Sequence, residues 1–150
     1  FSRDDIVRLW AARKSLSHAV KQIAPLKINE DVVVPVTRLA DFVAFLDATA
    51  RAQALPIVSF GHAGNGNLHV NLMVHPDDAG EMARARTALD AIMARVLALG
   101  GTLSGEHGIG TEKRRFLPQE IDAPTLALMR AIKRQFDPLG LLNPGKLFPD

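Results

Sequence analysis

The sequence predicts an α+β fold, and three observations lead to this prediction. Some segments carry apolar residues at helical spacing, and short β-branched runs stand between them. From residue 30 to residue 104 the segments follow the order β-α-β-β-α-β, as in a ferredoxin-like antiparallel sheet with helices on one face. Because 47% of the 150 residues are hydrophobic, we expect one domain over residues 1–150, with additional helices at both ends.

A first helix is predicted over residues 4–24, with Ser2 as its N-cap and its end set by Pro25. Its apolar positions are Ile6, Leu9, Trp10, Leu16, Val20 and Ile23. Arg13 falls within this apolar stripe and Ser17 lies one turn further on, so the charge of Arg13 needs an explanation. The alternative to a functional role is a guanidinium that reaches water from the edge of the stripe.

A strand, a helix and two further strands are expected next. The segment EDVVVP over residues 30–35 is β-branched and ends at a proline, after which Thr37 is predicted to cap a helix. IVSF and LHVNLMV flank the glycine-broken loop GHAGNGN and predict two adjacent strands. In the second of these strands His69, Asn71 and Met73 share a face opposite leucine and valine residues. We expect helices to cover the leucine and valine face, which leaves His69 and Asn71 toward a partner or a cavity.

The remaining elements are a helix, a short strand and a last helix. The third helix is predicted to end at the Gly100–Gly101 pair, and residues 102–104 to form a fourth short strand. Asp122 and Pro124 then open a helix that continues to Phe136. The segment DPLGLLNPGKLFP closes the chain as a tail interrupted by proline and glycine.

Composition excludes several classes of site. A formal net charge of +2 does not indicate a nucleic-acid partner, and we interpret the run at residues 113–115 as a solvated basic face. Without cysteine the chain has no disulfide, thiol nucleophile or iron–sulfur site. We find no apolar run long enough to span a bilayer and no signal-peptide pattern, so we expect a cytoplasmic location, with the inner face of the membrane as a second option. Because the chain opens at Phe1 and enters a helix at once, we expect a piece of a longer protein.

Three of the five histidines cluster in glycine-rich segments. His62 and His69 lie in GHAGNGNLHVN, and His107 follows Glu106 in SGEHGIG. Glycines between the first two histidines argue against a continuous helix, so we expect a strand, turn, strand arrangement that brings both imidazoles toward one point. Glu106 and His107 are adjacent, so on an extended segment their side chains are expected to diverge.

Two imidazoles and a carboxylate suit zinc or another divalent first-row metal, and a three-ligand set leaves coordination positions open for catalysis. His107 would then be free to act as a base. The alternative is a set of hydrogen-bonded loop histidines without a metal. Neither GHAGNG nor GEHGIG fits a nucleotide site, because the GxGxxG and GK[ST] patterns are missing.

Five segments taken together resemble one known family. LWAARK, EDVVVP, GHAGNGNLHVN, GGTLSGEHGIGTEKR and FDPLGLLNPGK follow the order found in the C-terminal domain of the FAD-linked oxidases. That family includes D-lactate dehydrogenases, the glycolate oxidase flavoprotein subunit and D-2-hydroxyglutarate dehydrogenase. The resemblance implies an FAD-dependent oxidation of a small D-2-hydroxy acid, with electrons passed on to an acceptor that we do not identify. It also implies that FAD is held mainly by a separate N-terminal domain, so we expect this chain alone to lack FAD and activity.

The resemblance further implies a role for individual residues. It makes His62, His69 and Glu106 the metal ligands, with zinc as the first expectation, and His107 the base that takes the proton of the substrate hydroxyl. Arg13 is implied to grip the substrate carboxylate, which a guanidinium binds bidentately.

Four further positions carry weaker implications. Ser17 occupies a position where some members place a threonine against substrate, and Asn71 is similarly placed to meet substrate or a metal ligand. Asn143 and Lys146 of NPGK resemble a tail that closes near the flavin ring, with a simple terminal turn as the alternative.

Two departures from the family pattern affect the expected chemistry. Asn65 stands where members commonly carry aspartate, which would weaken the polarisation of a ligating imidazole and leave the identity of the metal open. Lys27 is displaced from the place of a lysine that some members use against a longer substrate, and this favours D-lactate or glycolate over 2-hydroxyglutarate. A metal-dependent hydrolase and a metal-free module that binds anions through backbone N–H groups remain as alternatives, and a homo-oligomer remains an option.

Overall fold

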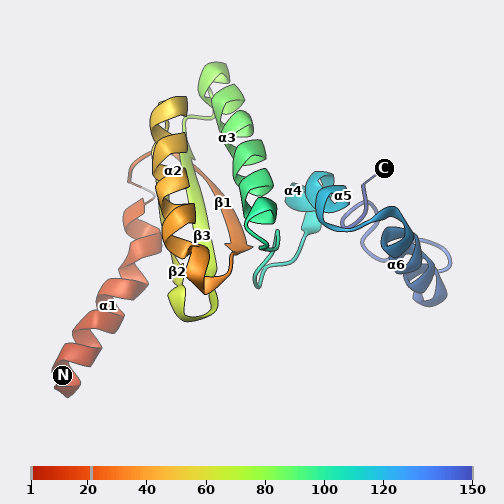
Figure 1. Cartoon of the computed structure of the whole chain (residues 1–150), viewed down its shortest axis with the longest axis horizontal. Helices are drawn as coiled ribbons and strands as arrows, with labels where there is room; N and C mark the ends of the chain where they lie inside the picture. The colour runs from red at the N-terminus through yellow and green to blue at the C-terminus, as the bar shows by residue number, and fades with distance from the viewer. Residues whose placement is uncertain (1, 21, 150) are drawn as a thin grey trace.

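The computed structural model describes residues 2–20 and 22–149, except for the side chain of Ser17. Within that part of the chain, a three-stranded antiparallel sheet with the strand order β1-β3-β2 lies against two long helices (Figure 1). The elements of this body are β1 (Leu26–Val33), α2 (Leu39–Gln53), β2 (Ile57–His62), β3 (Asn67–Val74) and α3 (Ala79–Ala98). The predicted α+β class is confirmed.

The hydrophobic core lies between the sheet and the helices α2 and α3. The central strand β3 contributes Leu68, Val70, Leu72 and Val74, which are all buried. They pack with Phe42 and Leu46 of α2 and with Ile92, Met93 and Val96 of α3. Each such side chain stabilises the fold by about 1.5–3 kcal/mol through its removal from water. The helices therefore cover the leucine and valine face, as predicted.

The opposite face of the sheet carries the polar residues. His69 on β3 stands opposite Asp31 on β1 and Phe60 on β2, and Asn71 stands opposite Asn29. At one end of this face Met73 packs with Val20 and Ala24. This face therefore has little apolar cover beyond that end, which leaves His69 half-buried beside a cleft.

The expected fourth strand is reduced to a single bridge between Thr102 and Val33. The N–H of each of these two residues donates to the carbonyl oxygen of the other. The chain then leaves the sheet because the N–H of Leu103 donates to the side chain of Glu120, and the N–H groups of residues 105–107 donate to the side chain of Asp31. The predicted strand at 102–104 is therefore wrong, and the sheet of the described chain ends at β1.

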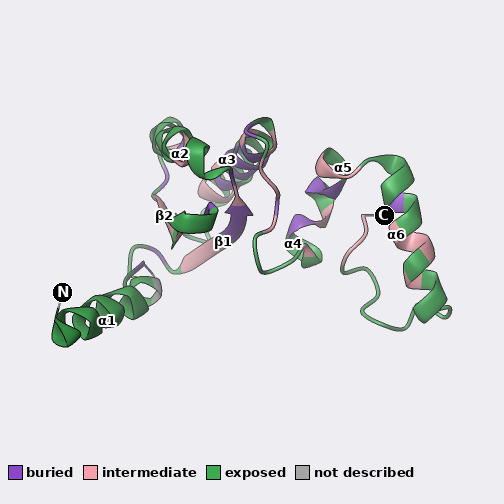
Figure 2. Cartoon of the chain, turned by 60° about the horizontal axis from the view of Figure 1, so that its bottom comes forward, coloured by how far each residue is buried: buried purple, intermediate pink, exposed green. Residues whose placement is uncertain are grey.

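Helix α1 (Arg3–Val20) begins at the predicted N-cap, since the N–H of Asp5 donates to Oγ of Ser2 at 3.1 Å. It ends four residues earlier than the predicted position 24. Its apolar residues are exposed along most of its length (Figure 2), including Ile6, Leu9, Trp10 and Leu16. The described residues therefore leave most of the apolar stripe of this helix uncovered.

The 3-10 turn η1 (Val36–Arg38) precedes α2, which begins without a side-chain cap. The predicted cap at Thr37 is therefore wrong, because Thr37 lies inside that turn. Beyond the bridge come α4 (Gly110–Lys113), η3 (Arg114–Phe116), α5 (Leu117–Glu120) and α6 (Ala123–Phe136). Helix α6 has the predicted N-cap, since the N–H of Thr125 donates to Oδ1 of Asp122 at 2.9 Å.

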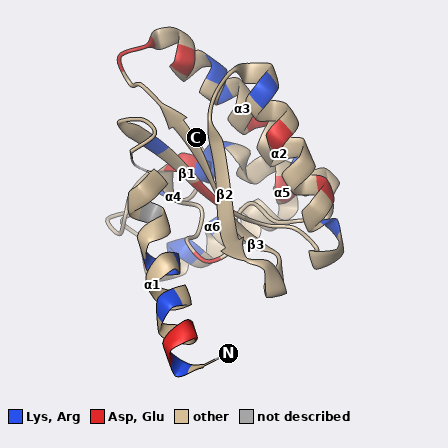
Figure 3. Ribbon diagram, turned by 90° about the vertical axis from the view of Figure 1, so that its left-hand side faces the viewer, with Lys and Arg blue, Asp and Glu red and all other residues tan. Residues whose placement is uncertain are grey.

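The two terminal helices α1 and α6 lie at opposite ends of the molecule (Figure 1). Figure 3 shows acidic and basic residues mixed along α1 and α3, in agreement with the low net charge of +2. Among the described residues, none of the helices combines the length and the apolar content needed to cross a membrane.

Candidate active site

A tight turn between β2 and β3 brings the first two histidines together. It consists of the 3-10 turn η2 (Ala63–Asn65) and Gly66, which has a φ of +76°. A Cβ at Gly66 would lie 2.0 Å from the carbonyl oxygen of Val34, so this position requires glycine for both conformation and space. The imidazole rings of His62 and His69 consequently lie 5.9 Å apart between centroids, edge to face. The predicted strand, turn, strand arrangement is confirmed.

Glu106 brings a carboxylate to the same point from the loop that follows the Thr102 bridge. Its Oε1 lies 3.4 Å from Nε2 of His69 and 3.9 Å from Nε2 of His62. Each of the three residues offers one ligand atom, and these atoms all lie within 4.8 Å of one another. Tetrahedral bonds of about 2.1 Å to a zinc ion would separate ligand atoms by about 3.4 Å, so the donor set has the size and chemistry of a zinc site.

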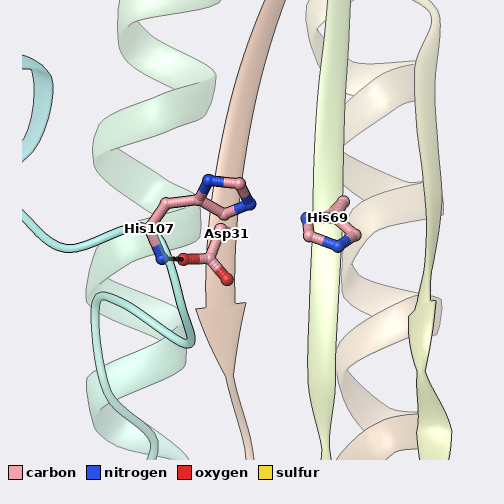
Figure 4. A group of neighbouring side chains, drawn as sticks. All are labelled: Asp31, His69 and His107. Atoms are coloured by element: carbon pink, nitrogen blue, oxygen red, sulfur yellow. Dashed lines mark hydrogen bonds between the residues drawn. The ribbon is translucent and has the colours of Figure 1, made fainter. Parts of the chain in front are cut away.

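His107 lies beside the same carboxylate. Its Nε2 is 3.6 Å from Oε1 of Glu106, and its ring centroid is 5.6 Å from that of His69. The expected divergence of the two adjacent side chains is therefore wrong. The segment is not extended but curls around the carboxylate of Asp31, to which the N–H groups of Glu106 and His107 donate at 3.0 and 2.9 Å. Figure 4 shows the hydrogen bond from His107.

The pKa values of two groups at the site, His69 and Asp31, are shifted downward for different reasons. Burial lowers the pKa of His69, against the opposite effect of the nearby Glu106 and Asp31 carboxylates. His69 is therefore a neutral imidazole near pH 7, the form that binds a metal. Burial alone would raise the pKa of Asp31, but N–H groups from His107 and Glu106 and the charge of Lys113 hold it below its usual range.

A cleft of about 310 Å³ opens next to the two imidazoles. It is lined by Arg13, Lys14, Leu16, Phe60, Gly61, His62 and His69. Arg13 also lies over the ring of Trp10, with Cζ 5.3 Å from the ring centroid, which restrains the guanidinium on α1. The structure therefore brings Arg13, His62 and His69 to one cavity, although they come from different elements.

Other predicted residues lie elsewhere. Asn71 is fully buried, and its side-chain amide has three partners: its Oδ1 accepts from Nδ2 of Asn29 at 2.8 Å, and its Nδ2 donates to the carbonyl oxygens of Val58 and His69. A substrate contact of Asn71 stays a prediction that would require the amide to leave these partners. Ser17 lies within α1, but its side chain is outside the described part of the structure.

The tail residues and the turn residue also stay predictions. Asn143 and Lys146 are exposed in the tail after α6, at the end of the molecule opposite α1 (Figure 1). Asn143 has a φ of +48°, in keeping with the turn that was the alternative interpretation. Asn65 is exposed in η2, between the two histidines.

Three residues near the site were not identified as site residues from the sequence. Asp31 directly precedes the β-branched run at residues 32–34, and a carboxylate within a predicted strand was the available signal. Lys113 is only 4% exposed and ion-pairs with Glu30 and Asp31, so the solvated basic face expected at residues 113–115 is wrong at its first position. Lys14 lines the cleft beside Arg13, and its adjacency in the sequence was the only signal.

Comparisons with known proteins give a family match and several relatives. Residues 2–147 match the family described as FAD linked oxidases, C-terminal domain. The chain is 35% identical over 147 residues to the glycolate oxidase subunit GlcD of Bacillus subtilis, covering 98% of this chain and 31% of that protein. It is 34% identical over 139 residues to D-lactate dehydrogenase of Anaerostipes hadrus, covering 92% of this chain and 29% of the relative.

A third relative is named for a different substrate. The chain is 38% identical over 148 residues to D-2-hydroxyglutarate dehydrogenase of Xanthomonas citri pv. viticola, covering 94% of this chain and 30% of that protein. The chain thus spans about a third of the length of the curated relatives it matches.

Proposed function

The chain belongs to the family of FAD linked oxidases, C-terminal domain, and on this basis we propose that it forms the substrate- and metal-binding part of an FAD-dependent dehydrogenase. The substrate would be a small D-2-hydroxy acid, oxidised to the 2-oxo acid. The observation that supports this most directly is the convergence of His62, His69 and Glu106 beside a cleft that also contains Arg13.

We propose a divalent cation, zinc first, at His62, His69 and Glu106. The donor set supports this, because two nitrogens and one carboxylate oxygen within 4.8 Å of one another suit zinc and form a three-residue set. The low pKa of His69 favours the neutral imidazole that ligation requires. A cation held there would supply a Lewis acid that stabilises negative charge on the reacting oxygen.

Arg13 would bind the carboxylate of the substrate. Its guanidinium forms part of the cleft that also contains both imidazoles, and Lys14 adds a second positive charge to the same wall. A planar guanidinium can donate two parallel hydrogen bonds to a carboxylate, which orients the substrate as well as holding it. The hydroxyl-bearing carbon would then lie between Arg13 and the histidines.

His107 would accept the proton of the substrate hydroxyl. Its Nε2 lies 3.6 Å from Glu106, on the side of the cluster near His69, so it is within reach of a hydroxyl group held at this point. The flavin, bound mainly by another part of the full-length protein, would supply the hydride acceptor. In this scheme the residues of this chain orient the substrate and remove its proton.

The position of Lys27, away from the cleft that contains Arg13, supports a small substrate such as D-lactate or glycolate. That lysine lines a different cleft of about 770 Å³ on β1, together with Met82 and Arg86. The Arg13 cleft of about 310 Å³ lies elsewhere and does not include it. An additional carboxylate, as in 2-hydroxyglutarate, would therefore have to rely on Lys14 or on residues outside the described chain.

The test is the absorption spectrum of the full-length protein during anaerobic titration with D-lactate, glycolate and D-2-hydroxyglutarate. We expect a bound flavin whose visible band bleaches with D-lactate or glycolate at the lowest concentration. Bleaching only with D-2-hydroxyglutarate would overturn the substrate assignment. A protein without any flavin spectrum would overturn the redox function and favour a metal-dependent hydrolase that uses the same three ligands.

A further inference from the structure

We infer that Asp31 is the positioning residue of the active-site loop: its carboxylate gathers the backbone of residues 104–107 and thereby fixes Glu106 and His107 against His69. Asp31 would touch neither substrate nor cofactor. The chemical importance of this loop depends on the proposed function, but the contacts themselves do not.

One carboxylate oxygen of Asp31 accepts from four donors of the loop. Oδ2 lies 3.1 Å from the N atom of Gly105, 3.0 Å from that of Glu106 and 2.9 Å from that of His107. The hydroxyl of Ser104 donates to the same oxygen at 3.2 Å. Three consecutive N–H groups directed at one anion form a concave backbone arrangement, and hydrogen bonds to a charged acceptor are about twice as strong as neutral ones.

The loop can approach this closely because residue 105 is glycine. A Cβ on Gly105 would lie 2.6 Å from Oδ1 of Asp31 and 2.7 Å from Oδ1 of Asn67. Real Cβ atoms do not approach oxygen to these distances, so any other residue here would push the loop away from the carboxylate.

A second contact holds the far end of the same loop. Nζ of Lys113 donates to the backbone carbonyl oxygen of Asp31 and lies 3.7 Å from both Oδ2 of Asp31 and Oε2 of Glu30. Lys113 is 4% exposed, so this charge is buried in the protein and not solvated. Residues 104–107 and Lys113 are thus both attached to Asp31, and the segment between them forms a closed loop on β1.

Strand pairing relates Asp31 to the rest of the site. Asp31 stands directly opposite His69 in the register between β1 and β3. Strand pairing therefore fixes the Asp31 carboxylate relative to the His69 imidazole. Because the loop is hydrogen-bonded to Asp31, Glu106 is held near His69 as well, with its Oε1 3.4 Å from Nε2 of His69. Asp31, His69 and His107 form a second group whose ligand atoms lie within 4.8 Å of one another, but Oδ2 of Asp31 accepts from the loop, as Figure 4 shows for the N–H of His107, and Oδ1 accepts from the N–H of Glu106 at 3.3 Å.

The decisive experiment is amide hydrogen exchange on the metal-free full-length protein, comparing wild type with Asp31→Asn. We expect exchange of the amides of residues 105–107 to accelerate by about 10-fold or more, because an amide oxygen replaces the charged acceptor. Amides of α2 and α3 should keep their rates. This readout involves no metal, flavin or substrate, so it remains informative if the proposed function is wrong.

Zinc binding provides a second readout of the same variant. We expect Asp31→Asn to weaken zinc binding about 10–100-fold, as loss of a supporting contact does in other metal sites, with flavin reduction recovering when zinc is raised to saturation. Asp78→Asn is the matched control, because Asp78 accepts from the N–H groups of Gly80 and Glu81 at the start of α3. It should leave both measurements unchanged.

Unchanged exchange at residues 105–107 in Asp31→Asn would overturn the inference, as would equal acceleration throughout the protein. If Asp31→Asn does not fold, Gly105→Ala is the second variant. Its added Cβ pushes the loop away from the Asp31 carboxylate and leaves the sequence of β1 unchanged. We expect that variant to accelerate exchange at residues 105–107 and to weaken zinc binding. Wild-type behaviour of Gly105→Ala in both measurements would equally contradict the role of Asp31.

Discussion

Nε2 of His69 lies 3.4 Å from Oε1 of Glu106, although the two residues belong to different and distant segments of the chain. One comes from the central strand β3 and the other from an irregular loop, so their proximity depends on the contacts that hold the loop to β1.

Replacing Arg13 should weaken substrate binding. Arg13→Ala in the full-length protein would remove the proposed charge-assisted bidentate contact, worth about 1.5–3 kcal/mol, so KM should rise about 10-fold or more. Arg8→Ala is the matched control, since Arg8 lies on the same helix but does not line the cleft. An equal KM in Arg13→Ala and Arg8→Ala would contradict a carboxylate contact.

Removing His107 should slow the chemistry without emptying the metal site. We expect His107→Ala to reduce the rate of flavin reduction by about 100-fold or more, because a general base is lost. Zinc content should be retained, since the three proposed ligands remain. His75→Ala, which removes an exposed histidine paired with Glu81, is expected to behave as wild type. A wild-type rate in His107→Ala would remove His107 from the mechanism.

The turn between the histidines should tolerate alanine poorly. Gly66→Ala changes this turn, and Gly100→Ala, after α3, is the control. Both substitutions force a side chain into positive φ, at +76° and +77°, which costs roughly 1–2 kcal/mol. Only Gly66 has a backbone oxygen within 2.0 Å of the added Cβ, so Gly66→Ala should lose about 1 kcal/mol or more beyond Gly100→Ala. Denaturant unfolding measures both, and equal losses would refute the role assigned to the Val34 contact.

The tail after α6 should loosen in acid. Lys133 and the N–H groups of Leu142 and Leu141 hold the pKa of Asp137 below its usual range. The pKa of an aspartate in an unfolded chain is about 3.9. The ionised Asp137 therefore stabilises the folded tail fully above that pH, and this stabilisation is lost as the pH falls through the lower pKa of the folded state. NMR signals of residues 138–146 followed from pH 6 to pH 2 should show this change. The same response in Asp137→Asn would mean that another group is responsible.

Much of the fold could be predicted because its elements follow local patterns. The alternation in β3 identifies which face carries His69, and the glycines at residues 64 and 66 rule out a helix through the histidine segment. The predicted strand at 102–104 fails because only Thr102 pairs with β1, whereas the N–H of Leu103 donates to the side chain of Glu120 and the hydroxyl of Ser104 donates to Asp31, which no local pattern reveals. The apolar stripe of α1 is a correct pattern that the described residues leave mostly uncovered.

The residues of the candidate site could be predicted from the sequence, but the contacts that hold them together could not. Clustered histidines and a carboxylate indicate a metal site from the sequence alone, and Arg13 in an apolar stripe is conspicuous. Asp31 and Lys113 were overlooked because their roles depend on contacts between β1 and a loop far along the chain. The convergence of Glu106 and His107 likewise follows from the curl of the loop around Asp31, which residue spacing does not specify.

The central claim is that His62, His69 and Glu106 share one metal ion, and zinc titration of chelator-treated full-length protein by calorimetry tests it most directly. We predict about one zinc per chain, binding weakened at least about 100-fold in His69→Ala, and unchanged binding in His75→Ala, with folding checked by circular dichroism. A wild-type protein that binds no zinc or other divalent first-row metal, or a folded His69→Ala variant that binds it as tightly as wild type, would contradict the account.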